Sequence, residues 1–269
     1  MKTSALMSIY VGTLPAELRG TLDSLVNQVQ QADEIIVVLD GPVDELVLSI
    51  LNDYSKNLPL RTIRSATNQG LGPALAKGLA HCSYDWVFRI DSDDIYPPER
   101  FALQVTYAKE NPSVHAVGGS LMEHYISNDK RTTKYRSVPL TPDRIRRYAK
   151  WRNPLNHQTV FFQKKAVLDV GSYQDMPFFE DYFLWARLLL SGYEIANLDH
   201  SLAETTVSID YFRRRGGLSY INNEARFVKS LVQLGFFSRR HGLIFFLFRI
   251  IVRQTPNSLR RLLYRIILR

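Results

Sequence analysis

The sequence predicts an α/β protein built on a largely parallel β-sheet with helices on its faces. Over the first two thirds of the 269 residues, short apolar runs alternate with segments whose apolar residues recur at helical spacing. Hydrophobic residues make up 45% and charged residues 22% of the chain, which is typical of a globular protein and too polar for one with many membrane spans. The length allows one large domain, or a domain of about 200 residues with an appendage.

The predicted strands and helices alternate in order along the chain. Strands are expected at 5–11, 34–39, 60–64 and 86–90, with helices over 18–26, 43–54, 73–82 and from 97–98 to about 110. The run at 34–39, EIIVVL, is almost continuously apolar, as in a buried parallel strand. In open α/β sheets, ligands bind beyond the carboxyl ends of the strands, so the residues that follow these runs are the first candidates for a site.

Acidic residues occupy two of these strand ends. Asp40 follows the run at 34–39, and Asp91, Asp93 and Asp94 follow the strand at 86–90. An aspartate before glycine is common in turns, so Asp40 alone fits turn chemistry equally well. Three carboxylates within four residues repel one another, and a divalent cation is the usual compensation. The segment 91–94 therefore predicts a metal site.

The middle of the chain offers weaker signals. The polar, basic stretch at 124–150 predicts a mobile loop and a short helix near 142–150, and a strand is expected at 158–162. His157 on its own is more typical of a hydrogen-bonded structural histidine than of a catalyst. Glu180 and Asp181 precede a helix at 182–190 that ends before Gly192, and acids in this position also stabilise a helix N-terminus.

The C-terminal part of the chain is strongly basic. Residues 213–269 contain 13 Lys and Arg against one acid, a net charge of +12, which leaves −4 for residues 1–212 within the total of +8. This division favours a polyanionic surface as partner, either anionic lipid or nucleic acid. The apolar run at 243–252 contains Arg249 and is about half the ~20 residues that span a bilayer. The segment 259–269 has the spacing of a basic amphipathic helix, which lies in a membrane interface or packs on the body or a partner subunit.

Cysteine content and the first residues favour a cytoplasmic protein. Cys82 is the single cysteine, so an internal disulfide is excluded, and no Cys/His cluster has zinc-ligand spacing. The N-terminus lacks the charged, apolar and small-residue pattern of a secretory signal.

Five segments, in order, resemble the family 2 inverting glycosyltransferases with a GT-A fold, of the type that builds bacterial surface polysaccharides. They are SLVNQ at 24–28, EIIVVLDG at 34–41, NQG at 68–70 with Gly78 ten residues after Asn68, DSDD at 91–94, and ED at 180–181. A lone Asp-x-Asp is weak evidence, whereas five elements in the right order are a strong signal. The resemblance covers about residues 5–217. It implies a Rossmann-like nucleotide-diphospho-sugar transferase domain with a mixed sheet at 1–212 and a helical extension at 213–269.

The resemblance also implies roles for single residues. Asp93 would bind Mn²⁺ or Mg²⁺ on the donor diphosphate, with Asp91 as a second ligand or a contact to ribose. Asp181, beside Glu180, would be the catalytic base. The residues implied in binding the nucleotide sugar are Tyr10, Asp40 at the nucleobase, Asn68, Asp91, His157 and Arg214.

Two departures from the family pattern bear on donor binding. An Arg-Asn pair common after the Asn-x-Gly loop is replaced by Leu75-Ala76, so Lys77 is the candidate replacement or a solvated helix residue. The first strand ends in Ile-Tyr-Val in place of the frequent Pro-Val-Tyr-Asn. The basic segment 213–217, which contains Arg214, fits a loop that closes over the diphosphate and a solvated linker equally well.

The expected activity is transfer of a hexose or N-acetylhexosamine from a UDP-sugar to a hydroxyl of a lipid-linked oligosaccharide, in exopolysaccharide, capsule or O-antigen synthesis. The expected location is the inner face of the cell membrane, as a peripheral protein with no nucleic-acid partner. A sugar nucleotidyltransferase is an alternative, although GTLP at 12–15 differs from the Gly-rich basic loop that it needs. The second alternative is a nucleic-acid-binding protein with a basic tail, although the sequence contains no recognisable motif that reads nucleic-acid bases. A dehydrogenase would need Gly-x-Gly-x-x-Gly after the first strand.

Overall fold

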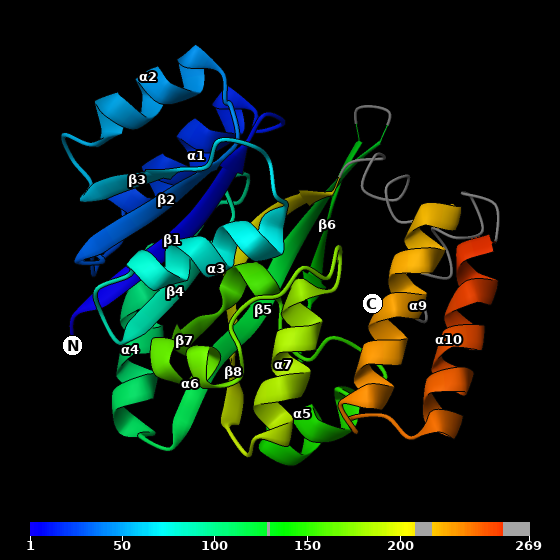
Figure 1. Cartoon of the computed structure of the whole chain (residues 1–269). Coiled ribbons are helices and arrows are strands. Elements are labelled where there is room, and N and C mark those ends of the chain that lie inside the picture. Colours follow the sequence, from blue (N-terminus) through cyan, green and yellow to red (C-terminus); the bar gives the residue numbers. More distant parts are fainter. Residues whose placement is uncertain (128–129, 208–216, 255–269) are drawn as a thin grey trace.

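The computed structural model describes residues 1–127, 130–207 and 217–254. These residues form one eight-stranded sheet with helices on both faces (Figure 1). The strands are β1 (Thr3–Tyr10), β2 (Glu34–Asp40), β3 (Leu60–Arg64), β4 (Trp86–Ile90), β5 (Val114–Ser127), β6 (Lys130–Arg136), β7 (Phe161–Gln163) and β8 (Glu194–Val207). Their order is β3-β2-β1-β4-β7-β5-β6, and β8 pairs with β5. The predicted α/β class with a mixed sheet is confirmed.

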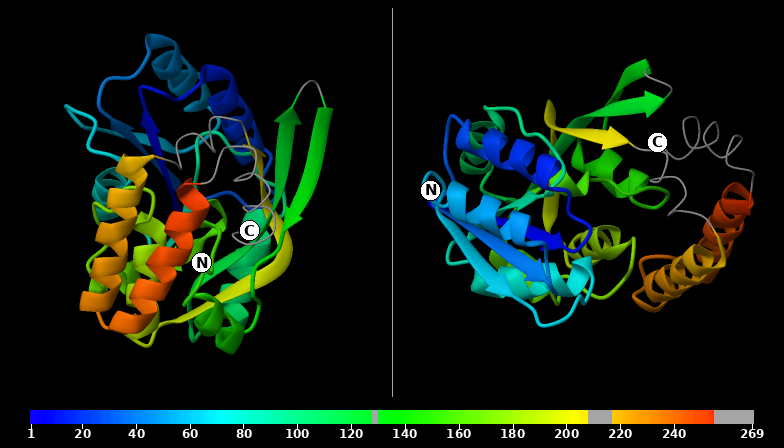
Figure 2. Two further views of the ribbon diagram at one scale, coloured as in Figure 1. Left: turned by 90° about the vertical axis from the view of Figure 1, so that its right-hand side faces the viewer. Right: turned by 90° about the horizontal axis from the view of Figure 1, so that it is seen from above.

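Helices cover the two faces of the sheet in separate layers. They are α1 (Pro15–Val26), α2 (Glu45–Tyr54), α3 (Leu71–His81), α4 (Arg100–Glu110), α5 (Pro142–Tyr148), the 3₁₀ helix η1 (His157–Thr159), α6 (Lys164–Asp169), α7 (Glu180–Leu190), α9 (Leu218–Gln233) and α10 (Arg239–Gln254). Apolar residues of α1, α2 and α4 pack on one face, and those of α3, α6 and α7 on the other. Helices α9 and α10 form a hairpin outside α7 (Figure 2).

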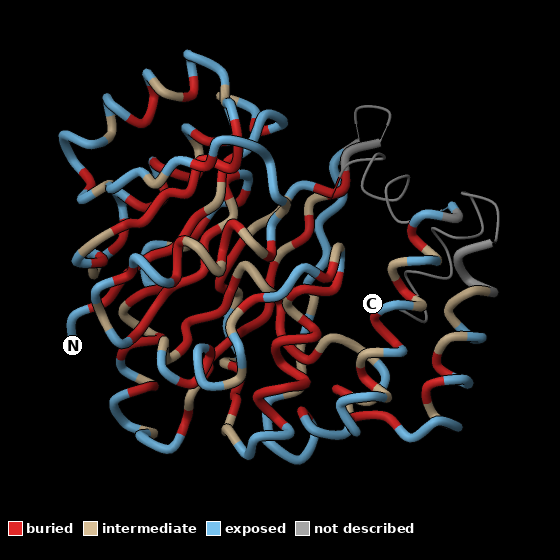
Figure 3. Tube along the Cα trace, in the orientation of Figure 1, coloured by how far each residue is buried: buried red, intermediate tan, exposed pale blue. Residues whose placement is uncertain are grey.

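The parallel half of the sheet brings three strand ends to one edge. Strand β1 lies between β2 and β4 and is parallel to both. Leu6 of β1 faces one core cluster and its neighbours Ala5 and Met7 face the other, so this strand is buried on both sides (Figure 3). Tyr10 pairs in register with Asp40, and β4 ends directly before Asp91. The residues predicted to form a site therefore leave the sheet at one edge.

One prediction of secondary structure is wrong, and another is confirmed only in part, since the strand expected at 158–162 is the shorter β7. The stretch expected to be a loop after residue 124 continues β5 into an antiparallel hairpin with β6. The polar composition of this stretch is compatible with a strand because β6 lies at the edge of the sheet and its residues 131–135 are exposed to solvent. The strand expected at 158–162 is preceded by η1, because the backbone amide and hydroxyl of Thr159 both donate to the Asn156 carbonyl, at 2.9 and 2.7 Å.

The C-terminal hairpin packs on the body through one face. Phe227 and Leu231 of α9 and Phe245 of α10 are buried in the same cluster as residues of α7. Arg249, which interrupts the apolar run of α10, forms an ion pair with the fully buried Glu224 of α9. The inner face of the α9–α10 hairpin therefore packs on the body of the protein. The predicted amphipathic helix at 259–269 and the basic residues 213–215 lie outside the described residues. Within the described ranges, no helix has the length and apolar character that crossing a bilayer requires.

Candidate active site

Three carboxylates gather directly after β4. Ligand oxygens of Asp91, Asp93 and Asp94 lie within 4.8 Å of one another. The Asp94 backbone carbonyl accepts a hydrogen bond from the Thr21 hydroxyl of α1 at 2.8 Å, and Ile95 forms a β-bridge with Glu204 of β8. Helix α1 and strand β8 therefore fix the turn that presents the acids.

These carboxylates fit a divalent cation. Asp94 is buried, and one of its carboxylate oxygens has no hydrogen-bond partner among the described residues. Burial, Asp91 and Asp93 raise the pKa of Asp94 well above its ordinary value. Asp93 has solvent-exposed surface, but the surrounding protein still reduces the hydration of its carboxylate. This desolvation, together with the negative charges of Asp91 and Glu17, raises the pKa of Asp93 to about 6. Hard oxygen ligands with uncompensated negative charge are those that Mg²⁺ and Mn²⁺ prefer.

A buried arginine holds Asp91 in place. The Arg89 guanidinium is inaccessible to solvent and donates to the Asp91 carboxylate at 2.6 Å and to His157 Nε2 at 3.3 Å. The Tyr173 hydroxyl lies 3.1 Å from the same His157 nitrogen. Because a guanidinium has only donors, this nitrogen accepts, and burial together with Arg89 lowers the pKa of His157 well below its ordinary value. His157 is therefore a neutral link in a chain that runs from Tyr173 to Asp91.

The second pair of acids opens α7. Glu180 is buried and Asp181 is half-buried in the first turn of the helix. The Asn153 side-chain amide donates to the Asp181 carboxylate at 2.5 Å, and the Tyr182 backbone amide donates to its other oxygen at 2.7 Å. Phe178 precedes this turn with a φ of 71°, a left-handed conformation that is uncommon outside glycine. The Asn153 amide and the Tyr182 backbone amide therefore help to orient the carboxylate that the family resemblance assigns as base.

The buried Tyr173 connects the aspartates after β4 with the region of α7. Its hydroxyl contacts His157, which accepts from the arginine that holds Asp91. A Cβ at Gly72 of α3 would lie 2.3 Å from the carbonyl oxygen of Gln174, the residue after Tyr173, and 3.5 Å from Glu180 Cβ. The segment that contains Tyr173 and the first acid of α7 therefore lie beside the same turn of α3.

The nucleotide-binding candidates lie at the neighbouring strand ends. Asp40 is buried, and its two carboxylate oxygens accept from the backbone amides of Gln69 and Gly70, at 2.8 and 2.9 Å. It therefore fixes the loop that contains Asn68, which is exposed. The exposed ring of Tyr10 extends from the adjacent strand.

Lys77 has a structural contact in this region. Its ammonium donates to the Arg64 carbonyl at 2.6 Å and to the Ser65 hydroxyl at 3.1 Å, at the end of β3. Lys77 therefore joins α3 to the end of β3. This structural role differs from the two roles expected from the sequence, which were donor binding and a solvated helix residue. Arg214, the remaining nucleotide-binding candidate, lies outside the described residues.

Sequence analysis missed several residues of the site. Arg89 had a detectable signal, because a charged residue inside an otherwise apolar strand needs a buried partner. Asp94 belongs to the predicted acidic cluster, but the family resemblance assigns it no role of its own, although it is the most buried of the three acids. Asn153 and Tyr173 gave no signal, because their function depends on contacts across the fold.

Comparison with known proteins identifies the family. The model of glycosyl transferase family 2 matches residues 4–175. The chain belongs to this family. The transferase is 39% identical to an uncharacterized glycosyltransferase of Haemophilus influenzae over the whole of both chains. It is 36% identical to the amylovoran biosynthesis glycosyltransferase AmsE of Erwinia amylovora, over 97% of each chain.

A third relative has a fully specified name. The transferase is 32% identical to the Escherichia coli UDP-Gal:alpha-D-GlcNAc-diphosphoundecaprenol beta-1,3-galactosyltransferase, over 100% of this chain and 97% of the relative. The predicted activity, an inverting glycosyltransferase, is thereby confirmed, and the nucleotidyltransferase alternative is set aside.

Solved structures share the fold of the transferase. S. aureus TarS 1–349 in complex with UDP-GlcNAc superposes with a TM-score of 0.64 at 18% identity, covering 86% of this chain and 67% of that one. The mannosyltransferase PcManGT from Pyrobaculum calidifontis, in complex with GDP-Man and Mn²⁺, has a TM-score of 0.64 at 15% identity, covering 88% and 65%. The predicted GT-A fold is confirmed.

Proposed function

We propose that the transferase moves a sugar from a UDP-sugar to a hydroxyl of a lipid-linked saccharide, with Mn²⁺ or Mg²⁺ bound by the acids after β4. The observation that supports it most directly is the group of Asp91, Asp93 and Asp94, whose ligand oxygens lie within 4.8 Å. The substrate classes follow from the E. coli relative, whose name specifies UDP-Gal and a GlcNAc diphosphoundecaprenol.

The predicted site residues divide into a donor side and an acceptor side. On the donor side, Asp40, which holds the 68–70 loop, would shape the nucleobase site, and the exposed Tyr10 ring would stack on the base. Asp91 and Asp93, joined by Asp94, would hold the cation. A bound cation supplies positive charge against the diphosphate as it leaves.

On the acceptor side, Asp181 takes the proton from the attacking hydroxyl. The hydroxyl oxygen bonds to the anomeric carbon of the donor sugar as the bond from that carbon to the diphosphate oxygen breaks. UDP leaves, and the hydroxyl proton ends on the Asp181 carboxylate. Asn153 and the Tyr182 backbone amide hold this carboxylate in place. A positioned base of this kind contributes about 10²- to 10⁴-fold in rate, and a single displacement inverts the anomeric carbon.

The C-terminal hairpin supports a location at the inner face of the cell membrane. Leu243, Ile244, Leu247 and Phe248 are exposed on one face of α10, and Arg240 lies one turn before them on the same face. An apolar helix face next to basic residues is the pattern of a helix lying in an anionic bilayer interface.

The substrate proposal is tested by transfer to a defined acceptor. Purified protein is incubated with Mn²⁺, with UDP-galactose, UDP-glucose or UDP-N-acetylglucosamine, and with an α-GlcNAc diphosphate bearing an alkyl chain. We expect UDP release that depends on the acceptor, a product one hexose or N-acetylhexosamine heavier, and an inverted anomeric configuration by NMR. EDTA should abolish transfer. Absence of acceptor-dependent UDP release with all three donors would refute the proposed substrates.

A further inference from the structure

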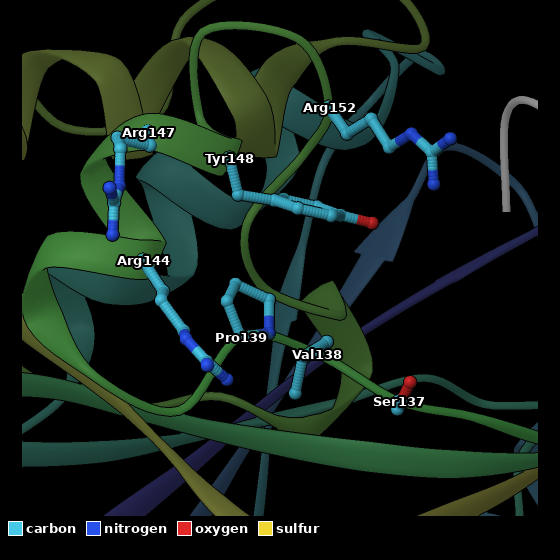
Figure 4. A pocket seen from close by; sticks show the side chains of 7 residues that line it. All are labelled: Ser137, Val138, Pro139, Arg144, Arg147, Tyr148 and Arg152. Atoms are coloured by element: carbon cyan, nitrogen blue, oxygen red, sulfur yellow. The ribbon is translucent and has the colours of Figure 1, made fainter.

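A groove rich in arginine lies beside α5, away from the three aspartates. Its volume is about 610 Å³, and Arg144, Arg147 and Arg152 line it together with Tyr148 over an apolar floor that includes Pro139 (Figure 4). The proposed chemistry uses none of these side chains. The groove therefore needs an explanation of its own.

The charged side chains of the groove are arranged to meet an anion. Arg144, Arg147 and Tyr148 lie at three- and four-residue spacing, on one face of α5. Arg144 and Arg147 lie to one side of the Tyr148 ring in Figure 4, and the Tyr148 hydroxyl points toward the side of Arg152. The Arg152 guanidinium lies 5.7 Å from the Tyr148 ring centroid.

Two arginines of the groove, Arg144 and Arg147, have no ion-pair partner among the described residues. Both of these residues are exposed. Guanidinium groups bind phosphate through paired hydrogen bonds, and several of them around one groove favour a ligand with more than one phosphate.

The segment 149–153, which borders the groove through Arg152, contacts two helices. It contacts α7, since the Tyr182 hydroxyl donates to the Ala149 carbonyl at 2.7 Å and the Asn153 amide donates to Asp181. The same segment contacts α10, since His241 Nε2 lies 2.8 Å from the Lys150 carbonyl. The exposed apolar face of α10 begins two residues after His241.

We propose that this groove binds the diphosphate of a lipid-linked saccharide acceptor, an inference that rests on the proposed function. Such an acceptor consists of sugar, diphosphate and lipid in that order. The segment that borders the groove contacts α7, which carries Asp181, and α10, which carries the exposed apolar face. When the diphosphate lies on Arg144 and Arg147, the sugar extends toward Asp181 and the lipid toward α10.

The first test measures binding without catalysis. Decyl diphosphate, which has no sugar, is titrated into the full chain in the presence of EDTA. EDTA removes divalent cations, so the carboxylates of the donor site repel the ligand and do not contribute to binding. We expect Arg144→Gln/Arg147→Gln to bind it at least about tenfold more weakly than the wild type, because each arginine contributes a charge-assisted hydrogen bond. Arg146→Gln is the matched control, because Arg146 lies on the same helix but outside the groove. No binding by the wild type, or equal loss in the control, would overturn the proposal.

Two further arms separate the possible sources of phosphate. Inorganic phosphate should bind at least tenfold more weakly than decyl diphosphate; equal affinity would make the groove a general anion site and refute the assignment. Phosphatidylglycerol vesicles should lose less affinity in the double variant than decyl diphosphate does, because an arginine near an anionic surface contributes only about 1 kcal/mol, or about fivefold in affinity. An equal loss of vesicle and decyl diphosphate binding in the double variant would show a headgroup site instead, and would also contradict the proposal.

An activity measurement separates this inference from the proposed function. With the α-GlcNAc diphosphate acceptor, the double variant should show a KM for acceptor raised at least about tenfold, with the KM for the UDP-sugar unchanged. If the wild type transfers sugar and the double variant keeps its acceptor KM, the groove assignment fails while the function stands. If the wild type transfers nothing but the groove binds decyl diphosphate, the function fails and the diphosphate site stands.

Discussion

The exposed face of α10 makes a quantitative prediction about membrane binding. Leu243, Ile244, Leu247 and Phe248 leave 59, 57, 51 and 43% of their surfaces exposed, so about half of each side chain is available to a bilayer. Full burial of such a side chain contributes about 1.5–3 kcal/mol, so the four together offer about 3–6 kcal/mol. Replacing all four with glutamine, which keeps helix propensity, should lower the vesicle partition coefficient by roughly two to four orders of magnitude.

Flotation with vesicles that contain phosphatidylglycerol measures this coefficient. The matched control replaces four exposed apolar residues of the body, Val29, Leu46, Leu168 and Leu190, with glutamine, since they expose 72, 51, 43 and 45% of their surfaces. The control should float like the wild type, and deletion of residues 240–269 should abolish flotation. Wild-type flotation by the α10 variant would refute the assignment of this face to the membrane.

Three further predictions concern the site and the hairpin. Asp93→Ala and Asp181→Asn should each reduce transfer by at least about 10²-fold while melting within a few degrees of the wild type; full activity in either would overturn its assigned role. Gly72→Ala would place a methyl group 2.3 Å from the Gln174 carbonyl oxygen, so we expect a loss of about 1–3 kcal/mol in thermal unfolding and slower transfer. Arg249→Met removes the cation beside the buried Glu224 and should cost about 3–5 kcal/mol in denaturant unfolding, with partial recovery in the double variant Glu224→Gln/Arg249→Met.

The parallel half of the fold could be predicted because its signals are local. The strands from β1 to β4 are apolar runs that end in turns, and the structure confirms their positions to within one or two residues. Gly78 shows what the family motif encodes, since a Cβ there would lie 2.4 Å from the Leu6 side chain and 2.6 Å from that of Val38. The close approach of α3 to the sheet therefore requires glycine at this position.

The antiparallel half was harder to predict because its strands have little apolar pattern of their own. Strand β6 is polar and exposed, and its hydrogen bonds to β5 define it. Strand β8 was missed altogether, although it forms the bridge at Ile95 that supports the metal-site turn. Pairing between distant segments leaves no periodicity in either segment alone. The acids of the site could therefore be predicted from the sequence, whereas the strand that holds their turn in place could not.

The charges of the site explain why the buried Arg89 lies beside the predicted cation ligands. Asp91, Asp93 and Asp94 would together contribute −3 when ionised, and Arg89 at 2.6 Å from Asp91 reduces the sum to −2. One divalent ion compensates that charge, and without it burial and mutual repulsion raise the pKa values of Asp93 and Asp94. Arg89 also donates to His157, which contacts the buried Tyr173. The same guanidinium therefore matches the charge of the acids to one divalent ion and connects Asp91, through side-chain contacts, to His157 and Tyr173.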